Sequence, residues 1–212
     1  GDFAASGDLG WEPAFSVAPT NRAPILRVRD DERQLELAKW SFRPSWMKAG
    51  GPPNINARIE TVATKPMFRG ALIKRRAVVP TTGYYEWKQL ADGKEPHFIH
   101  PADDSPLFLA GLYEWWKDPS KADDDPDRWL LSFTILTRDA IGALGSIHDR
   151  MPLFLDADFA DAWLDTDTEN VGDILDAAID AAPDLAATLE TRVVSSAVGN
   201  VRNDSPALIE PA

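Results

Sequence analysis

Four short stretches of the sequence place polar side chains where they could do chemistry, and the first surrounds a histidine. The stretch SIHDRMPLFL, residues 146–155, sets His148, Asp149 and Arg150 directly before an apolar run. Loops at strand ends often carry catalytic groups, and imidazole titrates close to neutral pH. His148 is therefore a candidate general acid or base. The alternative is a structural histidine, with Asp149 and Arg150 paired to each other or holding the loop.

The second stretch, TTGYYEWK at residues 81–88, contains a glutamate inside an aromatic, strand-forming run. Glu86 stands between Tyr85 and Trp87, where burial would raise the pKa of its carboxyl group. A carboxyl group with a raised pKa is suited to general acid or base catalysis. The alternative is that the alternation of a strand turns Glu86 toward solvent.

The third stretch, NINARIETVATKPMF at residues 54–68, holds Asn56 and Arg58 two positions apart. On a strand these two side chains would share one face. Asn both donates and accepts hydrogen bonds, and the Arg guanidinium binds phosphate in a bidentate manner. The alternative is a strand edge that carries an ordinary surface salt bridge.

The fourth stretch, WSFRPSWMK at residues 40–48, places Trp40 and Trp46 around Arg43 and Pro44. Aromatic rings and neighbouring arginines stack on unpaired bases in proteins that bind single-stranded nucleic acid. The alternative is that both tryptophans belong to the hydrophobic core.

The distribution of charge favours a phosphate-bearing partner although the chain as a whole is acidic. The 212 residues carry a net charge of −12, yet Arg22 to Lys88 hold 14 Lys and Arg against 6 Asp and Glu. A local basic field attracts phosphate even on an acidic protein. The alternative is that basic residues cluster by chance on solvated faces.

Several classes of protein are excluded by what the sequence lacks. It has no cysteine, no phosphate-binding glycine loop, no G-x-S-x-G elbow and no pair of metal ligands at helical spacing. We therefore expect neither a metal nor a cofactor. No stretch approaches the roughly 20 apolar residues of a membrane span, and the first residues do not resemble a signal peptide. These features predict a cytoplasmic protein without a membrane partner.

The elements that must position these residues are predicted to be strands followed by helices. Strand composition marks residues 75–87, 96–100, 107–116, 129–137 and 151–155, with residues 121–128 as a solvated hairpin connection. Residues 138–150 open as a short helix that breaks at Gly145. Asp156 caps a helix over residues 156–165, and residues 168–190 have helical spacing of apolar positions. The pattern predicts an α+β fold with mostly antiparallel pairing.

Seven ordered segments together resemble the SOS response-associated peptidase (SRAP) family. They are WEPAFSVAPTNRAPIL, NARIETVATKPMFR, RRAVVPTTGYYEWK, FLAGLYEWW, SFTILT, IHDRMPLFL and GNVRND, and they span Trp11 to Asp204. The resemblance implies one domain over residues 1–212, with a curved, barrel-like antiparallel β-sheet and flanking helices. It also implies a positively charged cleft for single-stranded DNA.

The chemistry that the resemblance implies is capture of abasic sites in single-stranded DNA. In this family an N-terminal cysteine attacks the aldehyde of the abasic sugar through its α-amine, and its thiol closes a thiazolidine ring. By resemblance, Asn56 positions the sugar and the N-terminal residue, Glu86 assists proton transfer at the amine, and His148 acts as acid or base at the opened sugar. The expected DNA contacts are Arg58, Trp40, Arg43, Pro44, Trp46, Trp87 and Arg150.

The N-terminus departs from the family pattern of Met-Cys-Gly-Arg followed by an aromatic residue. This chain begins Gly1-Asp2-Phe3, so Gly1 matches the family glycine and Asp2 replaces a DNA-contacting arginine. Only ten residues precede Trp11, where the family has room for a helix. Either residues are missing or the chain belongs to a branch without the thiol, and the abrupt match from Trp11 favours missing residues.

Three functions remain open at this point. The first is an abasic-site enzyme that crosslinks to single-stranded DNA as a monomer and protects the lesion. The second is a thiol autopeptidase that removes its own N-terminal Met. The third is a non-catalytic binder of single-stranded DNA that has lost the nucleophile.

Overall fold

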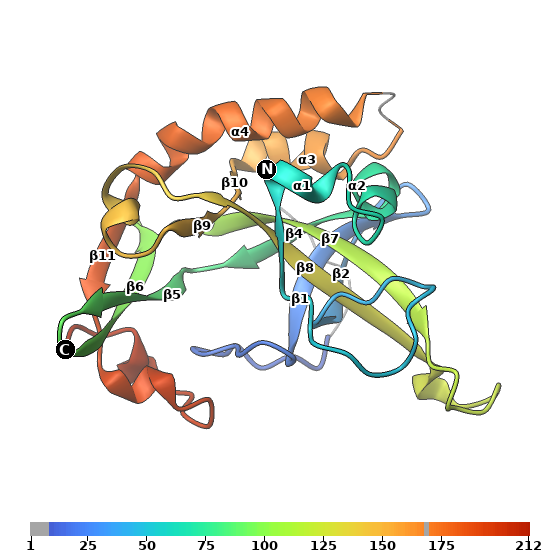
Figure 1. Cartoon of the computed structure of the whole chain (residues 1–212), viewed down its shortest axis with the longest axis horizontal. Helices are drawn as coiled ribbons and strands as arrows, with labels where there is room; N and C mark the ends of the chain where they lie inside the picture. Colours follow the sequence, from blue (N-terminus) through green and yellow to red (C-terminus); the bar gives the residue numbers. More distant parts are fainter. Residues whose placement is uncertain (1–8, 168–169) are drawn as a thin grey trace.

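A closed barrel of five strands forms the centre of the protein (Figure 1). The computed structural model describes residues 9–167 and 170–212, so the expectations for Gly1, Asp2 and Phe3 lie outside the described residues. The barrel strands, in spatial order, are β7 (Leu107–Lys117), β4 (Arg76–Thr81), β1 (Arg22–Arg29), β2 (Glu32–Trp40) and β8 (Trp129–Asp139).

Strand β8 closes the barrel because it pairs with strands on both of its edges. It runs antiparallel to β7 and parallel to β2, where Trp40 lies opposite Phe133. Further along β8, two short strands take the places of β2 and β7. Strand β3 (Asn56–Arg58) pairs in parallel on the β2 edge, and β9 (Arg150–Pro152) pairs antiparallel on the β7 edge. The two-residue strand β10 (Phe154–Leu155) pairs with β7. The barrel is therefore mixed rather than wholly antiparallel.

A glycine turns the chain from the barrel into a second sheet. Gly83 lies between β4 and β5 (Tyr84–Leu90), and a Cβ atom there would come within 2.4 Å of the Phe98 ring and 2.6 Å of the Ile99 carbonyl oxygen. Only glycine permits so close an approach. The second sheet is completed by β6 (Gly93–Pro101) and β11 (Leu189–Val193).

Two pairs of helices flank the barrel. The first pair, α1 (Ile59–Val62) and α2 (Arg69–Lys74), follows β3. The second pair, α3 (Ala157–Leu164) and α4 (Val171–Ala187), lies across one side of the barrel in Figure 1. The fully buried Trp163 of α3 donates its indole N–H to the Ala77 carbonyl of β4 at 3.0 Å. The main core joins buried residues of the barrel strands with buried residues of α1, α2, α3 and α4.

These observations confirm the predicted α+β class, the curved barrel-like sheet and the flanking helices. Asp156 caps α3 as predicted, accepting a hydrogen bond from the Phe159 N–H. The expected helix after residue 138 is only a 3-10 turn over Gly142–Ser146, because β8 continues to Asp139. Shorter 3-10 turns occur at Pro126–Arg128, Ser196–Gly199 and Pro206–Leu208.

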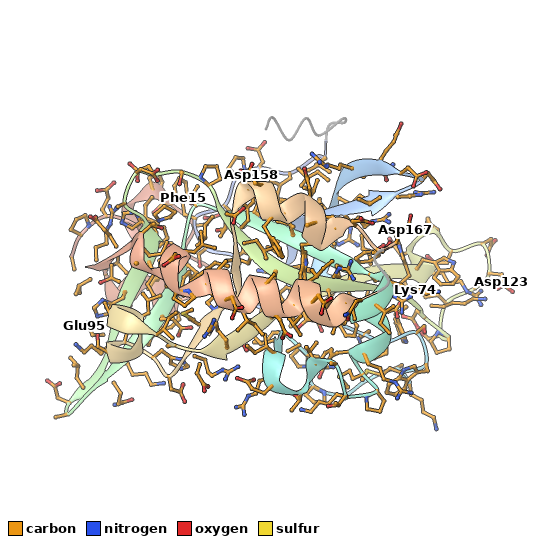
Figure 2. All side chains as sticks on the ribbon, turned by 90° about the horizontal axis from the view of Figure 1, so that it is seen from above. Phe15, Lys74, Glu95, Asp123, Asp158 and Asp167 are labelled. Atoms are coloured by element: carbon orange, nitrogen blue, oxygen red, sulfur yellow. The ribbon has the colours of Figure 1, made fainter. Side chains whose placement is uncertain are left out.

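The segment that leads from the chain's N-terminal end is fastened to β5 and to the C-terminal segment. The Tyr85 hydroxyl donates to the Phe15 carbonyl at 2.7 Å, and the Phe15 N–H donates to Asp204 Oδ1 at 2.6 Å. Phe15 and Tyr85 also pack on a small apolar cluster formed by Phe98, Val194, Val198 and Leu208. In Figure 2 Phe15 lies at the same end of the molecule as Glu95 of β6, far from Asp123 in the β7–β8 connection.

Removing the Tyr85 hydroxyl should destabilise this junction. We expect Tyr85→Phe to lower the free energy of unfolding by about 1 kcal/mol, because it leaves a partly buried carbonyl without its donor. Urea denaturation measures the change. Tyr84→Phe is the matched control, since the buried Tyr84 hydroxyl has no hydrogen-bond partner among the described residues. A Tyr85→Phe protein no less stable than the control would contradict the role assigned to this hydroxyl.

Candidate functional site

Asn56 and Arg58 project from β3 on one face, as predicted. Both are exposed, while Ala57 between them is buried. Asn56 lies opposite Ile135 and Arg58 opposite Thr137 of β8, and residues directly opposite in paired strands project to the same face. Within the described part of the chain the Arg58 guanidinium forms no hydrogen bond or ion pair. Its charge is therefore available to a phosphate.

Arg150 reaches the same end of β8 from the opposite edge. It lies opposite Asp139, so its side chain shares the face of Arg58. Its guanidinium forms a bidentate ion pair with Glu60, at 2.7 and 3.1 Å, and also bonds the Asp139 carboxylate and the Thr137 carbonyl. Arg150 is thus held by acidic and main-chain groups in this structure, and a DNA contact by it stays a prediction.

His148 lies in the turn that precedes β9, and its ring is fixed by the loop backbone. The Arg150 N–H donates to His148 Nδ1 at 3.0 Å. The same nitrogen lies 3.3 Å from the Arg150 carbonyl oxygen and 3.2 Å from Asp149 Oδ1. Three polar groups of the turn therefore surround Nδ1 and hold the ring in place.

Glu86 lies within the electrostatic reach of His148, although 62 positions separate the two residues. Burial raises the pKa of the Glu86 carboxyl, positive charge on His148 and the Trp87 N–H lower it, and the Asp149 charge raises it again, with burial dominant. The side chain is only partly buried. A carboxyl group with a raised pKa beside an imidazole is the arrangement that general acid–base chemistry requires.

Most of the predicted catalytic and phosphate-binding residues form a series in which each residue bonds to the next or acts on it electrostatically. Arg58 acts electrostatically on Glu60, Glu60 binds Arg150, and the Arg150 main chain holds His148. His148 in turn acts on Glu86. Asn56 shares the face of Arg58 but forms no side-chain hydrogen bond among the described residues. That these residues line one DNA-binding cleft remains a prediction.

Two of the predicted DNA-contacting tryptophans pack within the protein. Trp40 is partly buried, donates its indole N–H to the Ile55 carbonyl at 2.8 Å, and stacks on Phe133 with ring centroids 6.2 Å apart. Trp87 packs on the apolar cluster that also holds Phe15. Trp87 projects from β5 on the face opposite Glu86, as the alternation of a strand requires.

In the loop after β2, one of the three predicted DNA-contacting residues is exposed to solvent. Trp46 is 64% exposed, whereas Pro44 is buried. Arg43 is partly buried, with its guanidinium 4.9 Å from the centre of the Trp116 ring and its N–H bonded to Ser132 Oγ at 3.0 Å. Trp46 is therefore the predicted contact of this loop that solvent reaches, and its stacking on a base stays a prediction.

Sequence reasoning missed two residues beside the predicted ones. Glu60, the partner of Arg150, is 90 positions away from it, and no local pattern signals such a pairing. Tyr84 has a buried hydroxyl without a partner among the described residues, and burial together with the Glu86 charge raises its pKa strongly. Its position two residues before Glu86 on the same strand was a usable signal, because alternation puts both on one face.

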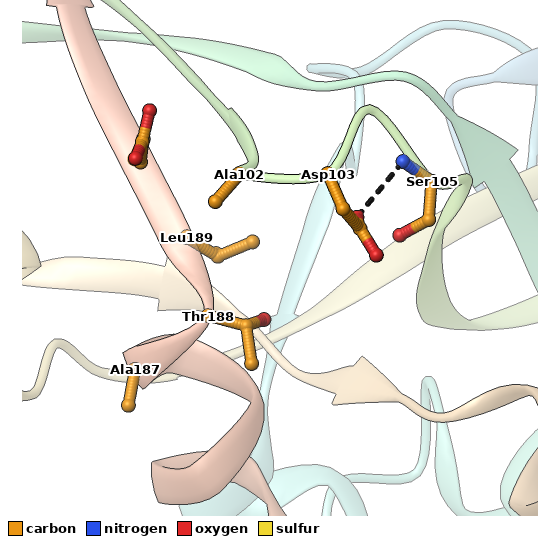
Figure 3. A pocket seen from close by; sticks show the side chains of 7 residues that line it. Ala102, Asp103, Ser105, Ala187, Thr188 and Leu189 are labelled. Atoms are coloured by element: carbon orange, nitrogen blue, oxygen red, sulfur yellow. Dashed lines mark hydrogen bonds between the residues drawn. The ribbon is translucent and has the colours of Figure 1, made fainter.

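A shallow concavity lies elsewhere, where the β6–β7 turn meets the start of β11 (Figure 3). Ala102, Asp103, Ser105, Ala187, Thr188, Leu189 and Glu190 line it. None of the predicted site residues is among them, and its charged side chains are acidic. It is therefore unsuited to DNA phosphate.

The described residues contain neither a metal-binding group of side chains nor a membrane-spanning helix. Between residues 9–167 and 170–212, no three His, Asp or Glu side chains are grouped so that they could hold a metal ion. Within the same ranges no helix combines the length and the hydrophobicity needed to cross a membrane.

Comparison with known proteins assigns the family. The model of the family described as SOS response associated peptidase (SRAP) matches residues 2–201. The chain belongs to the SRAP family. The abasic site processing protein YedK of Escherichia coli is 34% identical to this SRAP chain over 208 residues, covering 96% of the chain and 89% of YedK. The abasic site processing protein HMCES of Gallus gallus is 31% identical over 234 residues, covering 95% of the chain and 67% of HMCES.

Solved structures share the SRAP fold. A protein of Bacteroides thetaiotaomicron superposes with a TM-score of 0.76 at 24% identity, over 91% of this chain and 82% of its own. A phage-related protein of Bordetella bronchiseptica superposes with a TM-score of 0.66 at 27% identity, over 85% of this chain and 81% of its own.

The charges around Glu86 give a prediction with a definite sign. We expect His148→Gln to raise the pKa of the Glu86 carboxyl, because it removes a positive charge, and Asp149→Asn to lower it, because it removes a negative one. Carbon-13 NMR titration of the carboxyl carbon measures both. Asp118→Asn, in the β7–β8 connection, is the control and should leave the titration unchanged. Shifts of the opposite sign would show that His148 does not face Glu86.

Proposed function

We propose that the protein captures abasic sites in single-stranded DNA by forming a covalent bond through an N-terminal cysteine, and so protects the lesion. The observation that carries the proposal is the proximity of His148 to a Glu86 carboxyl group whose pKa is raised. The family match and the names of YedK and HMCES support an abasic site as the substrate. The proposal requires a cysteine directly before Gly1, which is the residue the family uses.

The reaction balances without an oxidant or a cofactor. Proton transfer from the sugar's C1′ hydroxyl to its ring oxygen opens the ring, and His148 is the group that carries this proton. The α-amine then attacks the C1′ aldehyde, a C–N bond forms, and the carbonyl oxygen leaves as water. Glu86 carries both amine protons in turn to this oxygen, the first to form the carbinolamine hydroxyl and the second to release it as water. Finally the thiol adds across the C=N bond, its sulfur bonding C1′ and its proton going to nitrogen.

Binding of the DNA strand is proposed to use the exposed groups near β8. Arg58 is exposed and its guanidinium is free of ion pairs within the described residues, so it suits a phosphate. Trp46 exposes enough of its ring to stack on an unpaired base. Asn56, on the face of Arg58, has an amide that can both donate to and accept from the sugar.

Adduct formation tests the proposal. A variant with Cys placed before Gly1, mixed with single-stranded DNA that carries one abasic site, should give an adduct that survives heat and denaturant. A protein prepared to begin at Gly1 should give only an imine, which persists after borohydride reduction. Glu86→Gln should slow the adduct by roughly 10²- to 10⁴-fold, the usual contribution of a positioned proton-transfer group.

The control is Glu95→Gln, which neutralises a carboxylate on the neighbouring strand β6 and should react at the rate of the parent. If neither chain forms an adduct, with or without borohydride, the protein is a non-catalytic binder instead. Equal slowing by both substitutions would remove Glu86 from the reaction.

The salt dependence of DNA binding tests the role of Arg58. Each phosphate neutralised by a basic side chain makes the slope of log K against log salt more negative by about 0.7 for single strands. Arg58→Ala should therefore weaken binding at low salt for every sequence and make the slope less negative by about 0.7. Arg29→Ala is the control, because Arg29 lies at the β1–β2 turn beside Asp30. An unchanged slope in Arg58→Ala would place the phosphates elsewhere.

A further inference from the structure

We propose that His97 of β6 is a positioning residue for Glu86, and that its buried ring nitrogen Nδ1 accepts a hydrogen bond from the protonated Glu86 carboxyl group. The two residues face each other across the second sheet, on strands β5 and β6. The effect of His97 on adduct formation rests on the function proposed above, whereas its effect on the titration of Glu86 does not.

The strand register places the two side chains next to each other. Glu86 and His97 are directly opposite in the antiparallel pair of β5 and β6. Such residues project to one face of a sheet, with Cβ atoms roughly 4.5–5.5 Å apart, which is within the reach of a glutamate side chain. The next opposite pair on this face, Tyr84 and Ile99, packs in the main core. The carboxyl group and the imidazole are therefore neighbours on a largely apolar surface.

One nitrogen of the His97 ring has a partner and the other does not. Nε2 lies 3.0 Å from Glu95 Oε1. A carboxylate only accepts hydrogen bonds, so the proton of the neutral ring is on Nε2 and Nδ1 carries a lone pair. Only 7% of His97 is exposed, and its Nδ1 atom is buried without a hydrogen-bond partner among the described residues.

A buried acceptor without a donor is costly, so a donor on the same face is expected to reach it. Three side chains of β5 on this face can donate: Tyr84, Lys88 and the protonated form of Glu86. Lys88 lies opposite Glu95 rather than opposite the ring. Tyr84 packs its ring on Phe154, with centroids 6.1 Å apart. Glu86 alone is directly opposite the ring that carries the unpartnered nitrogen.

The other groups around Glu86 leave this contact to His97. His148 and Asp149 face the carboxyl group from the turn before β9, where the charge of the first lowers its pKa and that of the second raises it. Burial is the largest influence and raises the pKa of Glu86. The protonated form, which is the one that can donate to Nδ1, is therefore more populated than in an exposed glutamate.

The contact gives Glu86 a proton affinity that suits its proposed role. Because only the protonated carboxyl group can donate to Nδ1, the hydrogen bond stabilises that form and makes the carboxylate a stronger base. A group that carries protons works best when its pKa lies near the pH of the reaction. The hydrogen bond also orients the resting carboxyl group, because its protonated oxygen is held toward β6.

His97→Gln tests the proposal, because glutamine can keep the bond to Glu95 but has no atom in place of Nδ1. It should lower the pKa of the Glu86 carboxyl group by about 1, since the protonated form loses its acceptor. Carbon-13 NMR titration of the carboxyl carbon measures the change. His97→Asn puts an amide at the Nδ1 position and should bring the pKa back toward that of the parent.

The ring nitrogen reports on the contact without any substitution at His97. In the parent protein, the nitrogen-15 signal of His97 Nδ1 should move at the same pH as the Glu86 carboxyl carbon. This step should disappear in Glu86→Gln, because the amide has no carboxyl proton to lose.

The rate of adduct formation tests the consequence for the reaction. In the protein with Cys before Gly1, His97→Gln should slow adduct formation by up to about tenfold, which is the loss in basicity of Glu86. The affinity for single-stranded DNA should not change, because His97 is buried.

His100→Gln is the matched control. His100 is a second buried histidine of β6, but it lies three positions further on and therefore on the opposite face, where its ring stacks on Phe98. Its substitution should change neither the pKa of Glu86 nor the rate.

Two results would overturn the proposal. One is a Glu86 pKa that is unchanged or raised in His97→Gln. The other is a His97 Nδ1 signal that responds to Tyr84→Phe and not to the titration of Glu86, which would make the Tyr84 hydroxyl the donor. Failure of the parent to form an adduct would instead concern the proposed function, since both NMR titrations are made without DNA.

Discussion

The pairing of β8 with four other strands is the constraint on which the site depends. Its first half closes the barrel between β2 and β7, and its second half holds β3 on one edge and β9 on the other. Backbone hydrogen bonds thereby place Asn56 and Arg58 opposite the turn that carries His148. A one-residue slip of β3 would turn both side chains away, so the register of this short strand decides whether the site exists.

A second constraint brings the carboxyl group to the imidazole. Glu86 belongs to neither edge of β8, and it lies in the second sheet after Gly83, where its carboxyl group is within electrostatic range of His148. The same strand sends Tyr85 and Trp87 to the opposite face, where they pack with Phe15 and the C-terminal segment. Burial around this junction raises the pKa of the Glu86 carboxyl group. The fold that positions this group therefore also sets how readily it takes up a proton.

The sequence predicted the elements whose signals are local. Strand composition found β4 to β8, and Asp156 marked the start of α3, because propensity and capping act within a few residues. The parallel pairing of β8 was not predictable, since it depends on contacts between segments about 90 positions apart. The exposed Trp46 and the buried Pro44 come from a single predicted stretch, and a local pattern does not show which of the two is buried by tertiary packing. Glu60 was missed for the same reason as the parallel pairing of β8, since its partner Arg150 lies 90 positions away in the sequence.

The resemblance to the SRAP family predicted more of the site than composition did, because a family motif carries tertiary information that local patterns lack. Composition identified a basic first half, and the structure shows that basic residues there have different surroundings. Arg58 is exposed, while Arg27 is buried in an ion pair with Glu36 beside Tyr113. Counting charges therefore indicates a class of partner but not the residues that meet it.

A crystal structure of the borohydride-trapped adduct with a short abasic oligonucleotide would test the central claim most directly. The account predicts that the reduced C1′ atom is bonded to the N-terminal nitrogen and lies between the Glu86 carboxyl group and His148 Nε2, with a neighbouring phosphate on Arg58. A sugar attached to a lysine side chain, or lying away from Glu86 and His148, would contradict it.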